Sequence, residues 1–140
     1  MSQITLEIGA TTSLRHIVRT EDLASALLID PQDNFPAVFA TSRMIALMEV
    51  AAARLLQPLL GEGELSVGVT VDVTHSAATL PEDEVHVTAR YLGKEGKLYL
   101  FDVRAEDSGG EIGRGTHRRA IIATQRLLDG ATQRRNQNIS

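Results

Sequence analysis

The feature that most constrains this chain is the apolar run from Met44 to Ala53, which is interrupted only by Glu49. Apolar residues recur there with the spacing of a helix face, and they make a stripe of Met44, Leu47, Met48, Ala51 and Leu55. A second stripe contains Glu49 together with Ile45, Ala52 and Leu56. A helix that is apolar nearly all round is a buried helix, so other structure must surround it.

We predict that this helix runs over residues 42–60, with Thr41 or Ser42 as its N-cap. Pro58 and Gly61 mark its end, because proline interrupts a helix and glycine is common just after one.

Four strands are predicted after the helix, over residues 65–77, 84–92, 98–106 and 111–126. In the first, valines alternate and His75 is next on their face; these residues are Val67, Val69, Val71 and Val73. The expected inward sets of the next two are Val85, Val87, Ala89 and Tyr91, then Tyr99, Phe101, Val103 and Ala105. Residues 94–97 are a hairpin turn between them. In the last strand, Gly113 and Gly115 indicate a bulge or a close backbone approach.

The segment before the helix is predicted to hold a strand over residues 13–18, a helical turn over 21–28 and a loop over 30–34. The fold class is therefore α+β, with one domain over residues 1–127 and a polar, disordered tail over 128–140. A sheet that wraps one helix covers it on one side only. The second apolar stripe needs another cover, so we predict a homodimer.

Composition excludes several classes of protein. A net charge of −4, the absence of tryptophan and the presence of only three phenylalanines and two tyrosines argue against a nucleic-acid partner. Without cysteine there is no disulfide, thiolate nucleophile or Cys-ligated metal. The main helix is too short and too polar to span a membrane. The N-terminus lacks the blocks of a signal peptide, so we expect a cytoplasmic protein.

The candidate chemistry is a pairing of Glu49 with His75 in one pocket. An adjacent carboxylate makes a histidine a stronger base, and the glutamate could alternatively act as the nucleophile or as the general base itself. The structural alternatives are a glutamate that pairs with an amide or a partner's arginine, and a histidine that is hydrogen-bonded in the core. Thr41 lies eight residues before Glu49, roughly 12 Å along a helix. The two could therefore meet across a dimer interface, or Thr41 could only cap the helix.

The other polar residues give weaker hypotheses. His86 is expected to be solvated, His117 could face either way, and no partner is evident for His16. A basic side of the last strand could bind an anion or be a solvated face; it comprises Arg114, Arg118, Arg119 and Arg126. Gly68 interrupts the valines, either for close approach of a ligand or to relieve a crowded crossing. A metal site would need a third ligand, and none has suitable spacing, so no metal is expected.

Four segments resemble, in order and with similar spacing, the fluoroacetyl-CoA thioesterase family of the hotdog fold. They are residues 35–41 (Phe35 to Thr41), 47–49, 73–79 and 113–119. The resemblance implies a catalytic set of Thr41, Glu49 and His75, substrate-side roles for Gly68 and Arg119, and a lid near Phe35. It also implies an active site at a dimer interface, no cofactor beyond the CoA of the substrate, and a CoA nucleotide held near basic surface residues.

The expected function is hydrolysis of a short-chain acyl-CoA to free acid and CoA, and the resemblance includes fluoroacetyl-CoA among the candidate substrates. Residues 31–34 hold no aromatic where the fluoroacetyl enzyme has a second one in its lid, so a general short-acyl thioesterase is the safer expectation. The alternative is a non-catalytic acyl-CoA-binding dimer. A hydratase or dehydratase of the same fold ranks lower, because no Asp-and-His pair lies near the helix. Whether dimers pair further is left open.

Overall fold

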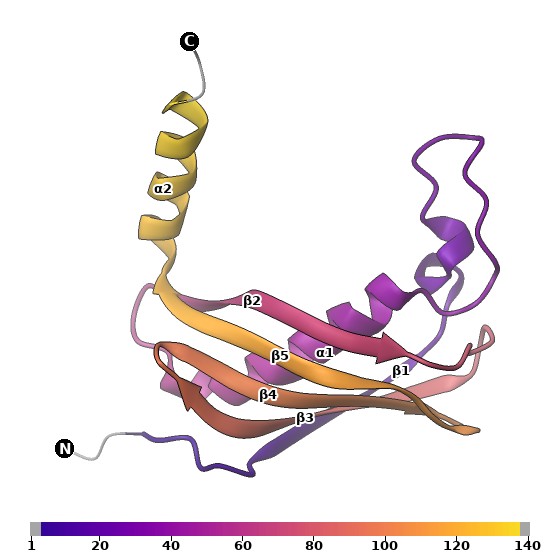
Figure 1. The fold of residues 1–140 in the computed structure, drawn as a ribbon, viewed down its shortest axis with the longest axis horizontal. Helices are drawn as coiled ribbons and strands as arrows, with labels where there is room; N and C mark the ends of the chain where they lie inside the picture. Colours follow the sequence, from indigo (N-terminus) through magenta and orange to yellow (C-terminus); the bar gives the residue numbers. More distant parts are fainter. Residues whose placement is uncertain (1–3, 138–140) are drawn as a thin grey trace.

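The computed structural model describes residues 4–137, in which a five-stranded antiparallel sheet curves around one long helix, α1 (Figure 1). Along the chain, the elements are β1 (Thr11–Ile17), the 3-10 turns η1 (Thr20–Asp22) and η2 (Ala24–Ala26), α1 (Thr41–Leu56), η3 (Gln57–Leu59), β2 (Glu64–His75), β3 (Glu84–Glu95), β4 (Leu98–Asp107), β5 (Gly110–Ala123) and α2 (Thr124–Gln137). The order of strands in the sheet is β1-β3-β4-β5-β2, so β2 is an edge strand. The predicted α+β class with a wrapped helix is confirmed.

The core lies between α1 and the concave side of the sheet. Both predicted inward sets on β3 and β4 are confirmed, with Tyr99 partly buried at the margin of the core and the others buried. From α1, the buried residues include Met44, Met48, Ala51 and Leu55. Each large apolar side chain buried in this way contributes roughly 1.5–3 kcal/mol, which makes this contact the main source of stability.

Helix α1 begins one residue earlier than predicted and is not capped by a hydroxyl. Ala40 occupies the N-cap position and makes no side-chain cap, so the predicted cap at Thr41 or Ser42 is wrong. Thr41 is instead the first helical residue, and its side chain is free for other contacts. The helix also ends earlier, at Leu56, because Pro58 lies within the tighter turn η3.

One strip of α1 is uncovered in the single chain, so the prediction of burial nearly all round is wrong for an isolated protomer. Val50 is exposed, and Ala46 and Ala53 beside it are only partly buried. The neighbouring edge strand β2 also exposes large apolar residues, namely Leu65, Val69 and Val71. These two surfaces are continuous through Glu49, which lies close to Gly68 of β2.

A bulge in β2 changes which residues face the helix. The register with β5 shifts between Gly68 and Thr70, so Val69 is an extra residue. Gly68 pairs with the inward-facing Arg119, whereas Val71 pairs with the inward-facing His117. The predicted single face of four valines is therefore wrong, because Val67 and Val71 lie on opposite faces.

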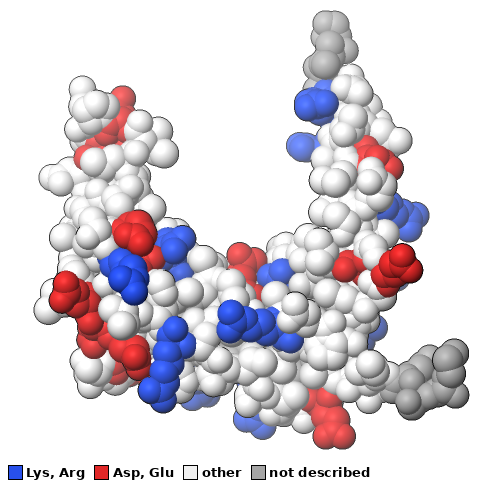
Figure 2. All heavy atoms as spheres, turned by 180° about the vertical axis from the view of Figure 1, so that it is seen from behind, with Lys and Arg blue, Asp and Glu red and all other residues white. Residues whose placement is uncertain are grey.

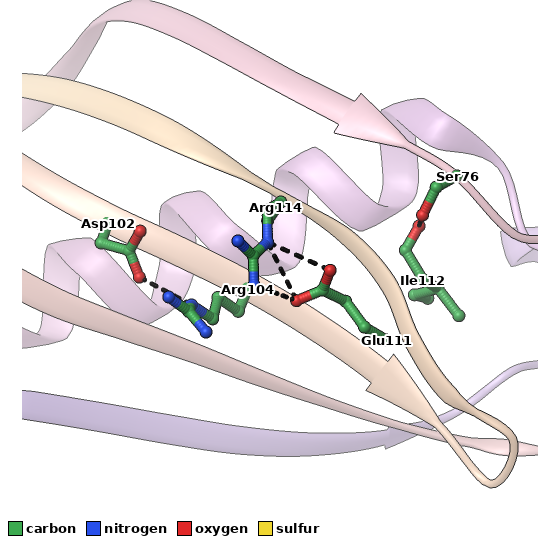
Figure 3. Close-up of polar contacts among 6 residues, drawn as sticks. All are labelled: Ser76, Asp102, Arg104, Glu111, Ile112 and Arg114. Atoms are coloured by element: carbon green, nitrogen blue, oxygen red, sulfur yellow. Dashed lines mark hydrogen bonds and ion pairs between the residues drawn. The ribbon is translucent and has the colours of Figure 1, made fainter.

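The convex face of the sheet is polar. In Figure 3, Arg114 donates to both carboxylate oxygens of Glu111, at 2.9–3.1 Å, and Arg104 donates to Asp102 at 3.1 Å. These partly exposed pairs contribute little to stability, and they lie on the side of the sheet away from α1. They identify this side as a solvated face.

The predicted disordered tail is wrong for most of its length. The last strand ends at Ala123, and α2 continues to Gln137 without a buried residue (Figure 1). Residues 138–140 lie outside the described range, and the division of the chain at residue 127 stays a prediction. No helix within residues 4–137 is long and apolar enough to cross a bilayer.

Close backbone approach, the second reading of the glycines in β5, is confirmed at Gly115. A Cβ there would lie 2.6 Å from Val73 Cα and would also collide with the Asp72 carbonyl oxygen.

We therefore expect Gly115→Ala to lower the free energy of unfolding by about 1–3 kcal/mol in urea titrations, because the backbone of β2 cannot move aside without disrupting its pairing with β5. Gly109→Ala is the matched control, since its Cβ meets only Asp107 Oδ1 at 3.4 Å. Equal stability of the two variants would contradict the prediction.

Candidate active site

Thr41 and His75 form a hydrogen-bonded pair where the start of α1 meets the end of β2. Thr41 Oγ1 lies 2.8 Å from His75 Nδ1. When Nδ1 is unprotonated, the hydroxyl donates to it, and the ring proton is on Nε2. Nε2 is buried and has no hydrogen-bond partner among residues 4–137. This contact uses the hydroxyl that helix capping would otherwise have occupied.

The environment of His75 favours its neutral form. Burial lowers the pKa of His75 below its usual value of 6.5. The ring of Phe39 meets the imidazole edge to face, with centroids 6.5 Å apart, and fixes its orientation. The result is a neutral, oriented imidazole with one nitrogen free for chemistry.

The pair lies on the wall of a hollow of about 290 Å³. The other lining residues are mainly apolar and come from η2, from the segment before α1 and from the segment after β2; they are Ala24, Pro36, Val38, Phe39, Ser76, Ala77 and Ala78. Phe35, the predicted lid residue, does not line this hollow and is 47% exposed on the segment just before it. The hollow is of a size for a small acyl group, and the position of Phe35 leaves it open in the single chain.

Glu49 lies two turns further along α1 and is held by Arg119. Arg119 Nη1 donates to Glu49 Oε1 at 3.2 Å, and Arg119 also donates to the hydroxyl and carbonyl of Ser66. Burial lowers the pKa of Arg119, and the carboxylate of Glu49 opposes that effect. An acid among apolar residues was expected to need a pairing partner, and Arg119 of the same chain is that partner for Glu49.

His117 completes this second cluster, and its proton position follows from its partners. Nδ1 lies 2.8 Å from the Thr70 carbonyl, which can only accept, so Nδ1 carries the proton. Nε2 then accepts from Arg119 at 3.2 Å. Burial, together with the charge of Arg119, lowers the pKa of His117. His117 therefore faces inward as a neutral residue that supports Arg119, a role that the sequence had left open.

Gly68 faces the same carboxylate across the bulge. A Cβ at this position would collide with Glu49 Oε1 and would lie 3.2 Å from His117 Cε1. The glycine is thus required for the carboxylate to approach the backbone of β2. Strand β5 holds three of the four arginines predicted on the last strand, and of Arg114, Arg118 and Arg119 only Arg119 points inward. The fourth, Arg126, lies in α2.

The structure therefore builds two clusters from the predicted site residues. It brings Thr41 together with His75, and it brings Glu49 together with Gly68 and Arg119. No hydrogen bond or ion pair joins the two clusters within residues 4–137, so the predicted pairing of Glu49 with His75 is not made inside one chain. Glu49 is half-exposed, with 41% of its side chain accessible, in a shallow hollow beside Ala46, Val50 and Ala53.

Asp22 is a residue of this region that the sequence did not single out. Its side chain is 1% exposed, and its carboxylate accepts hydrogen bonds from His16, Arg43 and the Arg19 amide at 2.7–3.0 Å. Its carbonyl oxygen also accepts from the amide of Ala40 at 2.9 Å, next to Thr41. Asp22 therefore fixes the start of α1 and, through it, the position of Thr41. Its two basic partners, His16 and Arg43, lie in β1 and α1, so only the folded structure shows that they contact Asp22.

The stability that Asp22 contributes depends on pH. Burial would raise the pKa of Asp22, but the bonds from Arg19, His16 and Arg43 outweigh it and lower the pKa below 3.8. A lowered carboxyl pKa contributes stability above pH 3.8 that is lost as the pH falls through the folded-state pKa.

We expect Asp22→Asn to cost about 2–3 kcal/mol of unfolding free energy at pH 7, because a neutral amide replaces the buried carboxylate that accepts these hydrogen bonds. The difference from the parent should shrink at pH 3, when measured by urea unfolding at both pH values. Asp129→Asn on exposed α2 serves as control and should change neither value. A loss that is the same at both pH values would contradict the electrostatic reading.

A curved antiparallel sheet around one long helix is the architecture of the hotdog fold, and the Thr–His pair and the braced carboxylate supply groups that a thioester hydrolase needs. Comparison with known proteins agrees. A family model described as fluoroacetyl-CoA-specific thioesterase matches residues 18–125. The fluoroacetyl-CoA thioesterase of Streptantibioticus cattleyicolor is 47% identical over 94 residues, which are 67% of this chain and 68% of that protein.

Solved structures give the same result. The fluoroacetyl-CoA thioesterase FlK superposes with a TM-score of 0.88 at 36% identity, over 93% of this chain and 98% of the other. A thioesterase superfamily member from Thermus thermophilus superposes with a TM-score of 0.85 at 25% identity, over 95% and 96% of the two chains. The chain belongs to the fluoroacetyl-CoA-specific thioesterase family, as its sequence motifs had predicted.

Proposed function

We propose that this chain hydrolyses the thioester of a short-chain acyl-CoA, of the kind that includes fluoroacetyl-CoA, to the free acid and CoA. The observation that carries the proposal is the neutral His75, bonded to Thr41 on the wall of a hollow large enough for a small acyl group. The activity of the fluoroacetyl-CoA thioesterase relative supports the same chemistry, as does the structure of an FlK mutant in complex with fluoroacetate and CoA. CoA enters as part of the substrate, and no separate cofactor is required.

The proposed active unit is a homodimer. The exposed strip of α1 and the free edge of β2 form one apolar surface through Val50, Val69 and Val71, which a second copy would cover. If two β2 edges pair antiparallel, the two α1 helices also run antiparallel. The roughly 12 Å that separates Thr41 from Glu49 along one helix is then bridged by the partner, whose Glu49 reaches the Thr41–His75 pair.

In this arrangement each group has a defined task. Arg119 holds Glu49 by a hydrogen bond to Oε1, which leaves Oε2 without a partner among residues 4–137. Glu49 either attacks the thioester carbonyl carbon or removes a proton from a water that attacks it. The carbon–sulfur bond then breaks, and the departing CoA thiolate takes up a proton that comes from water. In the water route Glu49 removes this proton from the attacking water, and in the covalent route it is released when water opens the anhydride. In both routes neutral His75, oriented by Thr41, accepts the proton and passes it to the thiolate. The Gly68 N–H is the proposed donor to the carbonyl oxygen as negative charge develops, and Phe35 is the proposed lid.

The two routes for Glu49 differ in where solvent oxygen appears. In single turnover in heavy-oxygen water, label in the carboxylate of Glu49 would identify a covalent intermediate, which water opens at the Glu49 carbonyl carbon.

Replacement of either Glu49 or His75 should abolish turnover while the fold is retained. We expect Glu49→Gln and His75→Ala each to lower kcat/KM by about 100-fold or more in a free-thiol assay with short acyl-CoAs, because each removes a proton-transfer or nucleophilic group. Glu111→Gln, on the convex face, is the control and should keep parental activity. Tight binding of acyl-CoA without thiol release by the parent protein would instead establish a binding protein.

A site that is shared between two protomers predicts complementation. Co-expression of Glu49→Gln with His75→Ala should restore about a quarter of parental activity, because half of the dimers are mixed and each mixed dimer holds one intact site. Co-expression of Glu49→Gln with Glu49→Ala should restore none. If the mixed pair stays inactive although mixed dimers are isolated, Glu49 and His75 do not act across the interface.

The pH profile should report His75. If unprotonated His75 is required, kcat/KM rises with pH, and the midpoint of that rise lies below 6.5 because burial lowers the pKa of this residue. The profile is measured with one acyl-CoA as the substrate, in buffers that cover pH 4.5 to about 8. A kcat/KM that does not fall as the pH is lowered through this range would contradict a role for unprotonated His75.

A further inference from the structure

Two segments project beyond the edge strand β2, one at each end. At its start, Glu64 pairs with Ala123, the residue before α2, and the Thr124 amide donates to the Gly63 carbonyl at 2.9 Å. At its end, His75 contacts Thr41, which follows the second segment. We name this segment, residues 27–36, the arm. Figures 1 and 2 show α2 and the arm standing on the same side of the molecule with a wide space between them.

The arm is exposed but internally braced. The carboxylate of Asp33 accepts from the amides of Ile29 and Asp30 at 2.9–3.0 Å, which closes its tip into a turn. The base of the arm is tied by the Ser25 amide, which donates to the Pro36 carbonyl at 3.1 Å. Large apolar side chains are nevertheless exposed along it, namely Leu27, Leu28, Ile29 at 95% and Phe35. A braced segment with this much exposed apolar surface is suited to receive another element.

Helix α2 has the complementary surface. It exposes Leu127 and Leu128, and it buries none of its residues against its own chain. An isolated helix of 14 residues with a central glycine is marginal in water, so it gains from a docking surface. The charges also match, since α2 carries Arg126, Arg134 and Arg135 against one aspartate, whereas the arm carries two aspartates and no lysine or arginine.

Within one chain these two surfaces are held apart at opposite ends of β2. The antiparallel pairing of two β2 edges, on which the proposed homodimer rests, reverses one copy relative to the other. The start of β2 in one copy then lies beside the end of β2 in its partner. This places the partner's C-terminal helix next to the arm, in the space visible in Figure 2.

We propose that α2 of each protomer docks on the arm of the other, through Leu127 and Leu128 against the exposed apolar residues of the arm. Because the arm ends at Pro36, which lines the acyl hollow together with Val38, the partner's helix holds that wall in place. The C-terminal helix is thus a latch on the lid of the other subunit. The inference rests on the proposed dimer, but it concerns surfaces that take no part in the chemistry.

The absence of native cysteine allows a direct test by cross-linking. Full-length chains with Ile29→Cys and with Leu128→Cys, carrying different tags, are co-expressed and treated with a short bis-maleimide. We expect a covalent species bearing both tags. Its yield should exceed that of a Ser13→Cys and Leu128→Cys pair by about tenfold or more, because thiols held in one complex react at millimolar effective concentration. Ser13 is exposed on β1, at the opposite edge of the sheet.

Sedimentation velocity on the same samples separates the two levels of the proposal. Dimers that give no more cross-linking than the Ser13 pair would overturn the docking of α2 on the arm and leave the proposed dimer standing. Monomers would overturn the dimer, and the docking with it.

Charge reversal provides a second measurement. Arg134→Glu with Arg135→Glu, added to the Leu128→Cys chain, should lower the cross-linking yield several-fold, and reversal of the arm charge by Asp30→Lys on the Ile29→Cys chain should restore part of it. A yield that is insensitive to all of these charges would overturn the electrostatic part of the proposed contact.

Discussion

A helix that is apolar over most of its circumference cannot be covered by one curved sheet, and the rest of this structure follows from that constraint. The sheet covers the side of α1 that carries Met44, Met48 and Ala51. The strip around Val50 is left beside the free edge of β2, and Glu49 lies within that strip. The position of the acid on an uncovered apolar surface separates it from His75 and makes a second copy the economical way to complete both the core and the site.

Three small backbone features turn this architecture into a candidate catalyst. The alanine at the N-cap of α1 leaves the Thr41 hydroxyl free for His75. The bulge at Val69 brings Gly68 under the carboxylate of Glu49, where any side chain would collide. The inward turn of Arg119 gives that carboxylate a charged partner and, through His117, a link to the backbone of β2. Together these features place the polar side chains of Thr41, Glu49 and Arg119 where they can contact one another or His75.

Much of this could be read from the sequence because period and composition act locally. The alternation on β3 and β4 identified their inward faces, and the apolar period identified α1. The motif segments gave the family. The N-cap could not be read, because a threonine that follows a loop satisfies the capping pattern whether or not an imidazole competes for its hydroxyl. The bulge was hidden too, since an unbroken valine alternation gives no sign of a shift in pairing. Helix α2 was missed because its polar sequence lacks the apolar stripe from which helices are recognised. Asp22 and Arg119 were not interpretable until β1, α1 and β5 were placed side by side, because their partners lie far away along the chain.

The separation of the two clusters along α1 has a consequence for how such a protein behaves at low abundance. Every chain holds both halves of the proposed machinery, yet it is unable to apply them to a single substrate molecule by itself. Specific activity would then depend on protein concentration and decline on dilution below the dissociation constant of the pair. Substitutions anywhere along the seam would count as losses of catalysis, even where they leave every reacting group intact.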